Sequence, residues 1–431
     1  PFTVRQVDLE LDLAPGRVRV RSQLSFTRLD PGARRFTLDG RDLRLLDIRL
    51  DGRPVTPDRF ELDASGLTLV DAPAEGRLET VAELVPGTPG MEGLVAIDGR
   101  LITHCEPEGF RRITWFPDRP DVMARFRCTL IADPGLYPTL LANGEVVAQG
   151  VMDDGRAFAT FDDPTPKSSY LFAAAAGRFA TLSDVHQTAS GKLVRLTVYA
   201  DEADLPFCRH GLATAKAAMA WDERTYGLEY GRPDLRMVVV RGYPGGAMEN
   251  PSLNLYATEF FQAHPLISTD DELRRITASV AHEYFHEWSG NRVGCRDWLD
   301  LTVKEGLTVL RQQQFMADQV GLAESRIDDL AHLKAQQYPE DDGALAHPVR
   351  PVGAGEASNL YTRTIYDKGA ELLRLVETRL GPERFNRALR TYFARFDGRP
   401  ASLEDLVATL EADAGVDLTG FRAWWRYLGA L

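Results

Sequence analysis

Hydrophobic and polar residues alternate along the first part of the chain. Hydrophobic side chains occupy every second position from Val7 to Leu13, and a similar alternation recurs from Val18 to Phe26. A period of two is typical of half-buried β-strands, because successive side chains of a strand point to opposite faces. This texture continues to about residue 178, so we predict an N-terminal antiparallel β-domain over residues 1–178.

The hydrophobic period changes after about residue 209. Helical patterns span 210–224, 270–288, 303–320, 361–380, 383–396 and 403–413, and strand patterns span 193–199 and 237–240. Thr269 and Glu272 form a capping-box pattern, Ser402 is a predicted cap, and Gly381-Pro382 is a helix stop. We therefore predict a mainly helical second domain over residues 179–431, which makes the chain an α+β multidomain protein.

Composition and charge narrow the class of protein. A chain of 431 residues suits two domains, and 44% hydrophobic with 26% charged residues is ordinary for a soluble globular protein. No run approaches the ~18 apolar residues of a membrane span, so we expect no membrane partner. The net charge of -13 argues against nucleic-acid binding, and it indicates either a solubility feature or a mild preference for cationic ligands.

The cysteines are widely spaced and form no CxxC pair, which argues against a disulfide framework and against a structural zinc knuckle. They are Cys105, Cys128, Cys208 and Cys295. Reduced thiols of this kind favour a cytoplasmic location.

The chemistry concentrates in the helical half, where residues 282–286 read His-Glu-Tyr-Phe-His. Four helical residues turn about 400°, so His282 and His286 project from one face and can bind one metal ion. Glu283 lies beside them, where its carboxylate can reach a metal-bound water. The alternative is an accident on a surface helix, which is expected in about one such chain per hundred.

Two further elements reduce the chance of an accident. Glu305 follows His286 after eighteen intervening residues, and two histidines with one carboxylate leave a zinc ion one open position, as in catalytic sites. The segment Gly246-Ala247-Met248-Glu249-Asn250 precedes the first histidine. Taken alone, Glu305 reads as a solvated helix residue and the Gly-rich segment reads as a turn. The three elements together point to a catalytic metal site.

These motifs resemble the aminopeptidase N family of gluzincin metallopeptidases, whose paired signature is HExxH-x18-E plus GAMEN. The stretches 104–111, 282–297 and 361–371 and the N-terminal β-pattern also resemble the bacterial branch of that family. The resemblance covers essentially the whole chain. It implies a thermolysin-like catalytic domain behind a saddle-shaped β-domain.

The resemblance also implies roles for individual residues. His282, His286 and Glu305 would hold one Zn2+ per chain, Glu283 would be the general base, and Tyr366 would stabilise the oxyanion. Substrate binding would involve two groups of residues. In the first group, Glu249 would hold the free α-amine with Glu106 as the second carboxylate, and the other residues of the GAMEN segment, Gly246, Ala247, Met248 and Asn250, would also take part in substrate binding. The second group would line the first side-chain pocket and comprises His104, Gly245 and Tyr361.

The implied activity is that of a zinc aminopeptidase of peptide catabolism with broad specificity. It would release N-terminal amino acids from peptides with a free N-terminus by attack of a zinc-bound water. Two alternatives remain, namely a catalytically weak, zinc-containing peptide-binding protein and a related endopeptidase. The chain ends about where the catalytic domain of the family ends, so we expect either an excised fragment or a short enzyme whose self-association covers the cleft.

Three departures from the bacterial pattern bear on the site. Gly245 stands where Met is common, which should open the first side-chain pocket, and His104 stands where Gln is expected, as a pH-sensitive contact. Gln312 stands seven residues after Glu305, where an acidic group is usual. If Gln312 orients a ligand histidine, it does so without charge; alternatively, Asp300 or Glu287 serves instead.

Overall fold

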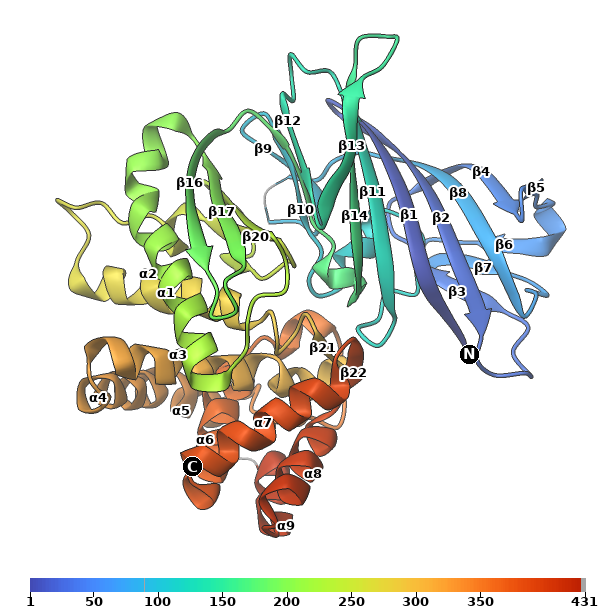
Figure 1. The fold of residues 1–431 in the computed structure, drawn as a ribbon. Helices are drawn as coiled ribbons and strands as arrows, with labels where there is room; N and C mark the ends of the chain where they lie inside the picture. Colours follow the sequence, from blue (N-terminus) through green and yellow to red (C-terminus); the bar gives the residue numbers. More distant parts are fainter. Residues whose placement is uncertain (89, 428–431) are drawn as a thin grey trace. The chain divides into compact units, whose positions relative to one another are not determined.

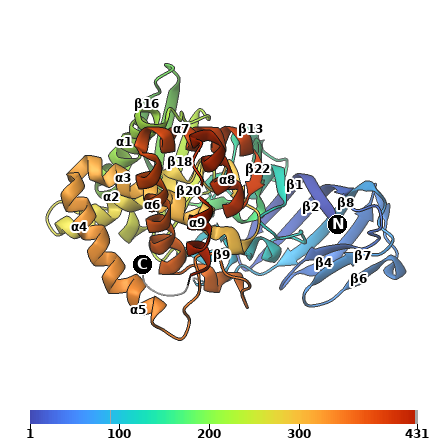
Figure 2. The ribbon, with the colours of Figure 1, turned by 90° about the horizontal axis from the view of Figure 1, so that it is seen from below.

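The computed structural model describes residues 1–88 and 90–427, and the chain forms two compact units (Figure 1 and Figure 2). The first unit comprises Pro1–Thr181, Tyr199–Glu202 and Arg236–Thr258, and the second comprises Leu182–Val198, Ala203–Leu235 and Glu259–Leu431. The first unit is built of β-sheets, whereas the second is mainly helical. The predicted fold class, a β-rich N-terminal region followed by a mainly helical region, is confirmed.

The largest sheet of the first unit has eight strands in the order β13-β14-β11-β1-β2-β8-β4-β5, and Figure 1 shows its long strands side by side. The strands are β1 (Phe2–Ala14), β2 (Arg17–Arg28), β4 (Arg44–Leu50), β5 (Arg53–Pro54), β8 (Glu75–Leu84), β11 (Met123–Ala132), β13 (Glu145–Val151) and β14 (Ala157–Ser168). The predicted alternation is visible in β1, where Val7, Leu9, Leu11 and Leu13 are buried in the core of the unit. The hydrophobic period therefore fixes which face of the sheet packs inward.

The prediction of a wholly antiparallel domain is wrong at one pairing of this sheet. β1 runs parallel to β11, with Val7 opposite Phe126, whereas the other neighbouring pairs of the eight strands are antiparallel. Parallel neighbours require a long crossover connection, and about a hundred residues separate these two strands in the chain. Local alternation does not encode the direction of a partner so distant in sequence.

Two smaller sheets and three strands of a third, five-stranded sheet complete the first unit. One has the order β12-β15-β10-β9, and another has the order β3-β7-β6. In the third, β18 pairs in parallel with β20, and β20 pairs antiparallel with the short strand β19. Their bounds are β3 (Phe36–Asp39), β6 (Phe60–Leu62), β7 (Gly66–Leu69), β9 (Gly93–Ile97), β10 (Arg100–His104), β12 (Thr139–Ala142), β15 (Ala174–Gly177), β18 (Asp234–Val240), β19 (Ala247–Met248) and β20 (Leu253–Ala257).

The second unit consists mainly of helices, which are labelled in Figure 2. They are α1 (Arg209–Tyr226), α2 (Asp270–Phe285), α3 (Glu305–Val320), α4 (Leu322–His332), α5 (Tyr338–Asp341), α6 (Gly369–Leu380), α7 (Pro382–Phe396), α8 (Leu403–Ala414) and α9 (Thr419–Arg422). The adjacent strands β16 (Ala180–Gln187) and β17 (Leu193–Ala200) lie mostly in this unit, and β21 (Val293–Cys295) pairs in parallel with β22 (Arg399–Ala401).

The helix caps and the helix stop that the sequence predicts are present in the structure. Thr269 caps α2 and Glu272 completes the capping box, while Ser402 caps α8 in the same way with Asp405. Gly381 separates α6 from α7, and Pro382 is the first residue of α7, where a missing N–H costs nothing. The cap at Thr269 fixes the start of α2, the helix that carries His282 and ends just before His286.

Several predicted bounds are wrong. α2 ends at Phe285 rather than at residue 288, and α3 begins at Glu305 because a 3-10 turn occupies Trp298–Val303. The predicted helix over 361–380 is regular only from Gly369, after a π-helical turn at Thr364–Lys368. The sequence patterns also failed to predict α4. In the described ranges 1–88 and 90–427, no helix is long and apolar enough to cross a membrane.

Candidate metal centre

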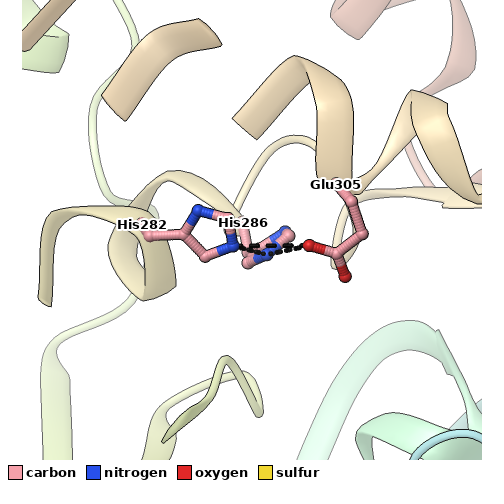
Figure 3. Close-up of side chains that lie close together, drawn as sticks. All are labelled: His282, His286 and Glu305. Carbon is pink, nitrogen blue, oxygen red and sulfur yellow. Dashed lines mark hydrogen bonds and ion pairs between the residues drawn. The ribbon is translucent and has the colours of Figure 1, made fainter. Parts of the chain in front are cut away.

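Two helices and the turn between them carry the candidate metal ligands. His282 lies in the last turn of α2, His286 directly follows the last residue of that helix, and Glu305 is the first residue of α3. Figure 3 shows the three side chains pointing toward one another. All three are deeply buried or nearly so, and their ligand atoms lie within 4.8 Å of one another.

The distances within this group suit a small metal ion. The Nε2 atoms of His282 and His286 lie 2.9 Å apart, and Oε2 of Glu305 lies 3.3 and 3.4 Å from them. Tetrahedral ligands about 2.0–2.2 Å from zinc are separated from each other by about 3.3 Å. The donor set of two imidazoles and one carboxylate, with room for a fourth ligand, is that of catalytic zinc sites.

The partners of the other ring nitrogens explain why a cation belongs here. Nδ1 of His286 lies 2.7 Å from the carbonyl oxygen of Ser289, which can only accept, so this Nδ1 carries the proton. Nδ1 of His282 lies 3.0 Å from Oε1 of Gln312 and is held in the same tautomer. Both Nε2 atoms therefore direct lone pairs toward the carboxylate oxygen of Glu305. Three lone pairs that converge in a buried place repel one another unless a cation lies between them.

The charges around Glu305 keep it ionised. Burial alone would raise the pKa of Glu305, but the Lys304 ammonium, His286 and His282 outweigh that effect and hold the pKa well below its usual range. Nζ of Lys304 donates to Oε1 at 2.5 Å, which leaves Oε2 facing the histidines. Burial, together with repulsion from His286, lowers the pKa of His282. The carboxylate of Glu305 is thus ionised and the imidazole of His282 is neutral, which are the forms that bind a metal ion.

Three further predicted residues lie in the same unit. Glu283 follows His282 on α2 and is buried, with 7% of its surface exposed. The ring of Tyr366 stacks on the His282 imidazole with centroids 6.2 Å apart and an interplanar angle of 13°. Tyr361 and Tyr366 both pack against a small hydrophobic cluster of Leu301, Leu360 and Ile365. Tyr366 lies in the π-helical turn at Thr364–Lys368, and this local irregularity places its ring next to His282, one of the candidate metal ligands.

The predicted amine-binding residues lie in the first unit. Gly246 has φ +73°, a conformation that favours glycine, and it leads into β19, which contains Ala247 and Met248. Glu249 and Asn250 follow and are almost fully buried. Glu106 lies two residues after the end of β10 and is 8% exposed. The segment after β10 and the segment after β19 thus each contribute one buried carboxylate, from Glu106 and Glu249 respectively.

The side chain of His104 brings these two segments together. A Cβ atom at Gly245 would lie 2.7 Å from Cε1 and 3.0 Å from Nδ1 of His104. The same Nδ1 lies 3.3 Å from the hydroxyl of Tyr243, and the two rings meet edge to face. The imidazole therefore fills the space that a side chain at position 245 would need. Burial lowers the pKa of His104 to about 4, so the ring is neutral near pH 7 and becomes charged only in acid.

Of the three residues proposed to orient a ligand histidine, Gln312 is the one in contact. Asp300 instead accepts from Nε of Arg350 at 3.0 Å and from the backbone N–H of Leu403 at 3.1 Å. Glu287 lies near Asn291 and Arg232, with its carboxylate 3.5 and 4.0 Å from them. His282 is therefore held by a neutral amide.

Replacing Gln312 with glutamate should raise zinc affinity by about tenfold, because a carboxylate partner makes the opposite imidazole nitrogen a stronger ligand. Competition with a chromophoric chelator measures this change. Gln319→Glu, an exposed change on the same helix, is the matched control and should leave the affinity unaltered. Equal or weaker zinc binding by the Gln312 variant would show that the charge at this position is unimportant.

The sequence patterns missed some residues around the ligands. Ser289 and Thr308 contact His286, through a carbonyl oxygen at 2.7 Å and a hydroxyl at 3.1 Å, and Lys304 holds Glu305. Lys304 was recognisable as the neighbour of a ligand in sequence. The contact of Thr308 depends on how α3 packs against the end of α2, which no local pattern shows.

Comparison with known proteins places this geometry in a family. Residues 210–425 match the Peptidase family M1 domain, and residues 97–171 match the Peptidase M1 N-terminal domain. Aminopeptidase N of Caulobacter vibrioides is 43% identical over 100% of this chain and 50% of its own length, and that of Escherichia coli is 39% identical over 99% and 49%.

A solved structure agrees with these sequence matches. The crystal structure of Legionella pneumophila aminopeptidase A in complex with aspartic acid superposes with a TM-score of 0.91 and 32% identity, over 99% of this chain and 50% of that one. The chain thus spans about half the length of the relatives it matches. With two matching domains, a convergent metal-binding group and full-length coverage of this chain by its relatives, the protein belongs to peptidase family M1, a family of metallopeptidases.

Proposed function

We propose that this chain carries the activity of a zinc-dependent aminopeptidase, which hydrolyses the first peptide bond of peptides with a free N-terminus. The observation that carries the proposal is the convergence of two Nε2 atoms and one carboxylate oxygen within 2.9–3.4 Å, beside Glu283 and Tyr366. The names of the relatives point to the same reaction class.

The proposed roles follow from the chemistry of each side chain. His282, His286 and Glu305 hold the zinc ion, which when bound would lower the pKa of water and polarise a carbonyl group. Glu283 accepts the proton of the attacking water and passes it to the leaving amine. The phenol of Tyr366 donates a hydrogen bond to the substrate oxygen on which negative charge develops.

Exopeptidase action would come from the two buried carboxylates of the first unit. Glu249 and Glu106 bind the α-ammonium group of the substrate, while Gly246, Ala247, Met248 and Asn250 shape the segment that presents Glu249. A blocked amine would leave these carboxylates buried without a partner charge. Breaking a buried pair costs on the order of 3–5 kcal/mol, which is about a hundredfold to several thousandfold in binding.

The same proposal assigns domains, a side-chain pocket, a location and partners. Residues 1–178 form the N-terminal β-domain and 179–431 the catalytic domain, with His104, Gly245 and Tyr361 lining the first side-chain pocket. The four cysteines are buried and unbridged, which supports a cytoplasmic location. The partners are peptides with a free N-terminus. The chain also associates with itself in solution, and sedimentation that showed only monomer at micromolar concentration would contradict this.

Hydrolysis of aminoacyl-4-nitroanilides of Ala, Leu, Arg and Phe tests the function. We expect cleavage of the free-amine substrates, none of the N-acetylated controls, loss of activity with 1,10-phenanthroline and recovery with zinc. Cleavage of N-acetylated peptides would favour an endopeptidase. No cleavage despite one bound zinc ion per chain would favour a peptide-binding protein.

Replacing Gly245 with alanine should lower the free energy of unfolding by about 1–3 kcal/mol, because the new Cβ atom would overlap the His104 ring. Gly245 has no positive φ, so the backbone itself tolerates alanine. Thermal unfolding of a double-mutant cycle with His104→Ala measures the effect. Most of the cost should be absent in the His104→Ala background, where Cε1 of Tyr243 at 3.2 Å is the remaining close contact of the new Cβ atom. An equal cost in both backgrounds would contradict a clash with His104.

A further inference from the structure

The second unit contains a cavity of about 350 Å³ that plays no part in the proposed reaction. Its walls come from α1, α3, α4, α6 and α7, which are labelled in Figure 1. This volume lies in the range of small-ligand sites. The lining combines carboxylates, arginines and an apolar side. The cavity therefore suits a small molecule that carries both charges and an apolar group.

Asp329 on α4 is the least satisfied acceptor of the cavity. Among residues 1–88 and 90–427, no partner forms a hydrogen bond or a close ion pair with its side chain. Burial raises the pKa of Asp329 to about 6, and Arg374 and Arg326 counteract this only in part. Asn386 on α7 adds a second acceptor, because its buried Oδ1 has no hydrogen-bond partner in the described part of the chain. Both residues line the cavity, and an ammonium group is the kind of donor that either acceptor would take.

Arg374 on α6 supplies an incompletely satisfied donor. One of its terminal nitrogens donates to Oε1 of Gln313 at 2.6 Å, but its buried Nε forms no hydrogen bond within the described residues and lies 3.5 Å from Glu371. Glu371 is already held by Arg326 through two bonds of 2.6 and 2.5 Å. Arg374 therefore retains capacity for a ligand carboxylate.

The apolar part of the lining indicates the third feature of the ligand. Trp221, Ala317, Leu322 and Pro382 border the cavity, and Leu322 is 71% exposed. A side chain that covered Leu322 would remove apolar surface from water. One positive group, one negative group and a short aliphatic group are the three parts of an aliphatic α-amino acid.

We propose that this cavity binds a free aliphatic α-amino acid, with its ammonium group at Asp329 and Asn386, its carboxylate at Arg374 and its side chain against Trp221 and Leu322. This second site goes beyond the proposed peptidase function and does not require it. Free amino acids are also the products of that reaction. The fraction of chains with an occupied cavity would therefore rise with the concentration of the product.

Equilibrium dialysis of radiolabelled L-leucine against the zinc-loaded protein tests the proposal. Leucine also fits the proposed active site as a product, so the informative quantity is the number of sites lost in a variant. Asp329→Asn should remove one site per chain or weaken it at least tenfold. Asp328→Asn, a change of the neighbouring exposed carboxylate that does not line the cavity, should bind leucine as the unaltered protein does.

Two fragments of leucine test the mixed character of the site. Competition by 3-methylbutan-1-amine or by 4-methylpentanoate should be at least tenfold weaker than competition by unlabelled leucine at the site that Asp329→Asn removes. Unchanged leucine binding in Asp329→Asn, or equal competition by the amine alone, would overturn the proposal. Neither result bears on peptide hydrolysis, which is measured separately.

Stability measurements exclude misfolding of the variant. The charged and titratable groups that act on Asp329 are Arg326 and Asp328 from α4 and Arg374 and Glu371 from α6. Because the pKa of Asp329 is raised in the folded protein, folding favours its protonated form, and this contribution is lost as pH rises from about 4 to about 6. Asp329→Asn should therefore melt at the same temperature or higher than the unaltered protein at pH 8. A lower melting temperature would show that Asp329 is a structural residue, contrary to the proposal.

Discussion

Replacing Glu283 with glutamine should lower kcat for aminoacyl-4-nitroanilides by about 10²–10⁴-fold, the contribution of a positioned general base. Glutamine keeps the volume of the buried side chain and one acceptor oxygen, but it replaces the second oxygen with an NH2 donor and cannot take up a proton. His282, His286 and Glu305 remain in place, so the variant should still bind one zinc ion per chain. Steady-state kinetics and metal analysis of the same preparation measure both quantities.

Glu287→Gln is the matched control for this experiment. Glu287 is also a buried glutamate, four residues further along the chain and just beyond the end of α2, but its carboxylate lies near Arg232 and Asn291. We expect its kcat to change by only a few-fold. Loss of zinc from the Glu283 variant would assign that residue to metal binding, and full activity would remove it from catalysis.

The part of the site that sequence predicted well is the part that depends on local geometry. His282 and His286 are four residues apart, and the helical rise and turn alone bring their rings together, as the structure shows with an Nε2–Nε2 distance of 2.9 Å. The capping box at Thr269 is equally local, because each partner lies within one turn of the other. Patterns of this length do not need knowledge of the tertiary structure.

Features that depend on distant packing were not predictable in this way. The parallel pairing of β1 with β11 joins strands about a hundred residues apart, and the contact of Thr308 with His286 requires α3 to lie against the end of α2. The helix α4 was missed because its polar face dominates its sequence, and Ser325 is its one buried residue among those described. The π-helical turn that carries Tyr366 has no signature of its own, so a continuous helix was the natural expectation.

The two departures from the bacterial pattern near the first side-chain pocket have a common explanation in the structure. Sequence suggested that Gly245 opens space, but the imidazole of His104 occupies the position that a side chain at 245 would need. The two positions are 141 residues apart in the chain, so only the folded structure shows that they compensate for each other. Gln312 is a different case. The resemblance to the bacterial branch implied a histidine-orienting residue at this position, and the structure shows Oε1 of Gln312 3.0 Å from Nδ1 of His282.

Replacing His286 with alanine should abolish zinc binding at micromolar metal concentrations and reduce peptide hydrolysis to background. The effect should exceed the about 10–100-fold loss of affinity that follows removal of an outer partner of a ligand, because a ligand itself is lost. The same variant should respond differently to chelators. Zinc at a thousand times its dissociation constant stabilises a protein by about 4.1 kcal/mol, so 1,10-phenanthroline should lower the melting temperature of the unaltered protein. The His286 variant, which binds no zinc, should melt at one temperature with or without the chelator.

The control for this variant is His332→Ala, which removes a half-exposed histidine on α4 and should leave zinc content, activity and the chelator response unaltered. The geometry explains why His286 is the more critical of the two candidate imidazole ligands. It is 1% exposed, and both Ser289 and Thr308 contact its Nδ1, whereas Gln312 is the one contact of the His282 Nδ1 in the described part of the chain. A His286→Ala protein that retained one zinc ion per chain would show that the metal binds elsewhere. In that case the convergence of His282, His286 and Glu305 would have to be explained without a metal, although three lone pairs in a buried place would then lack a cation to hold them together.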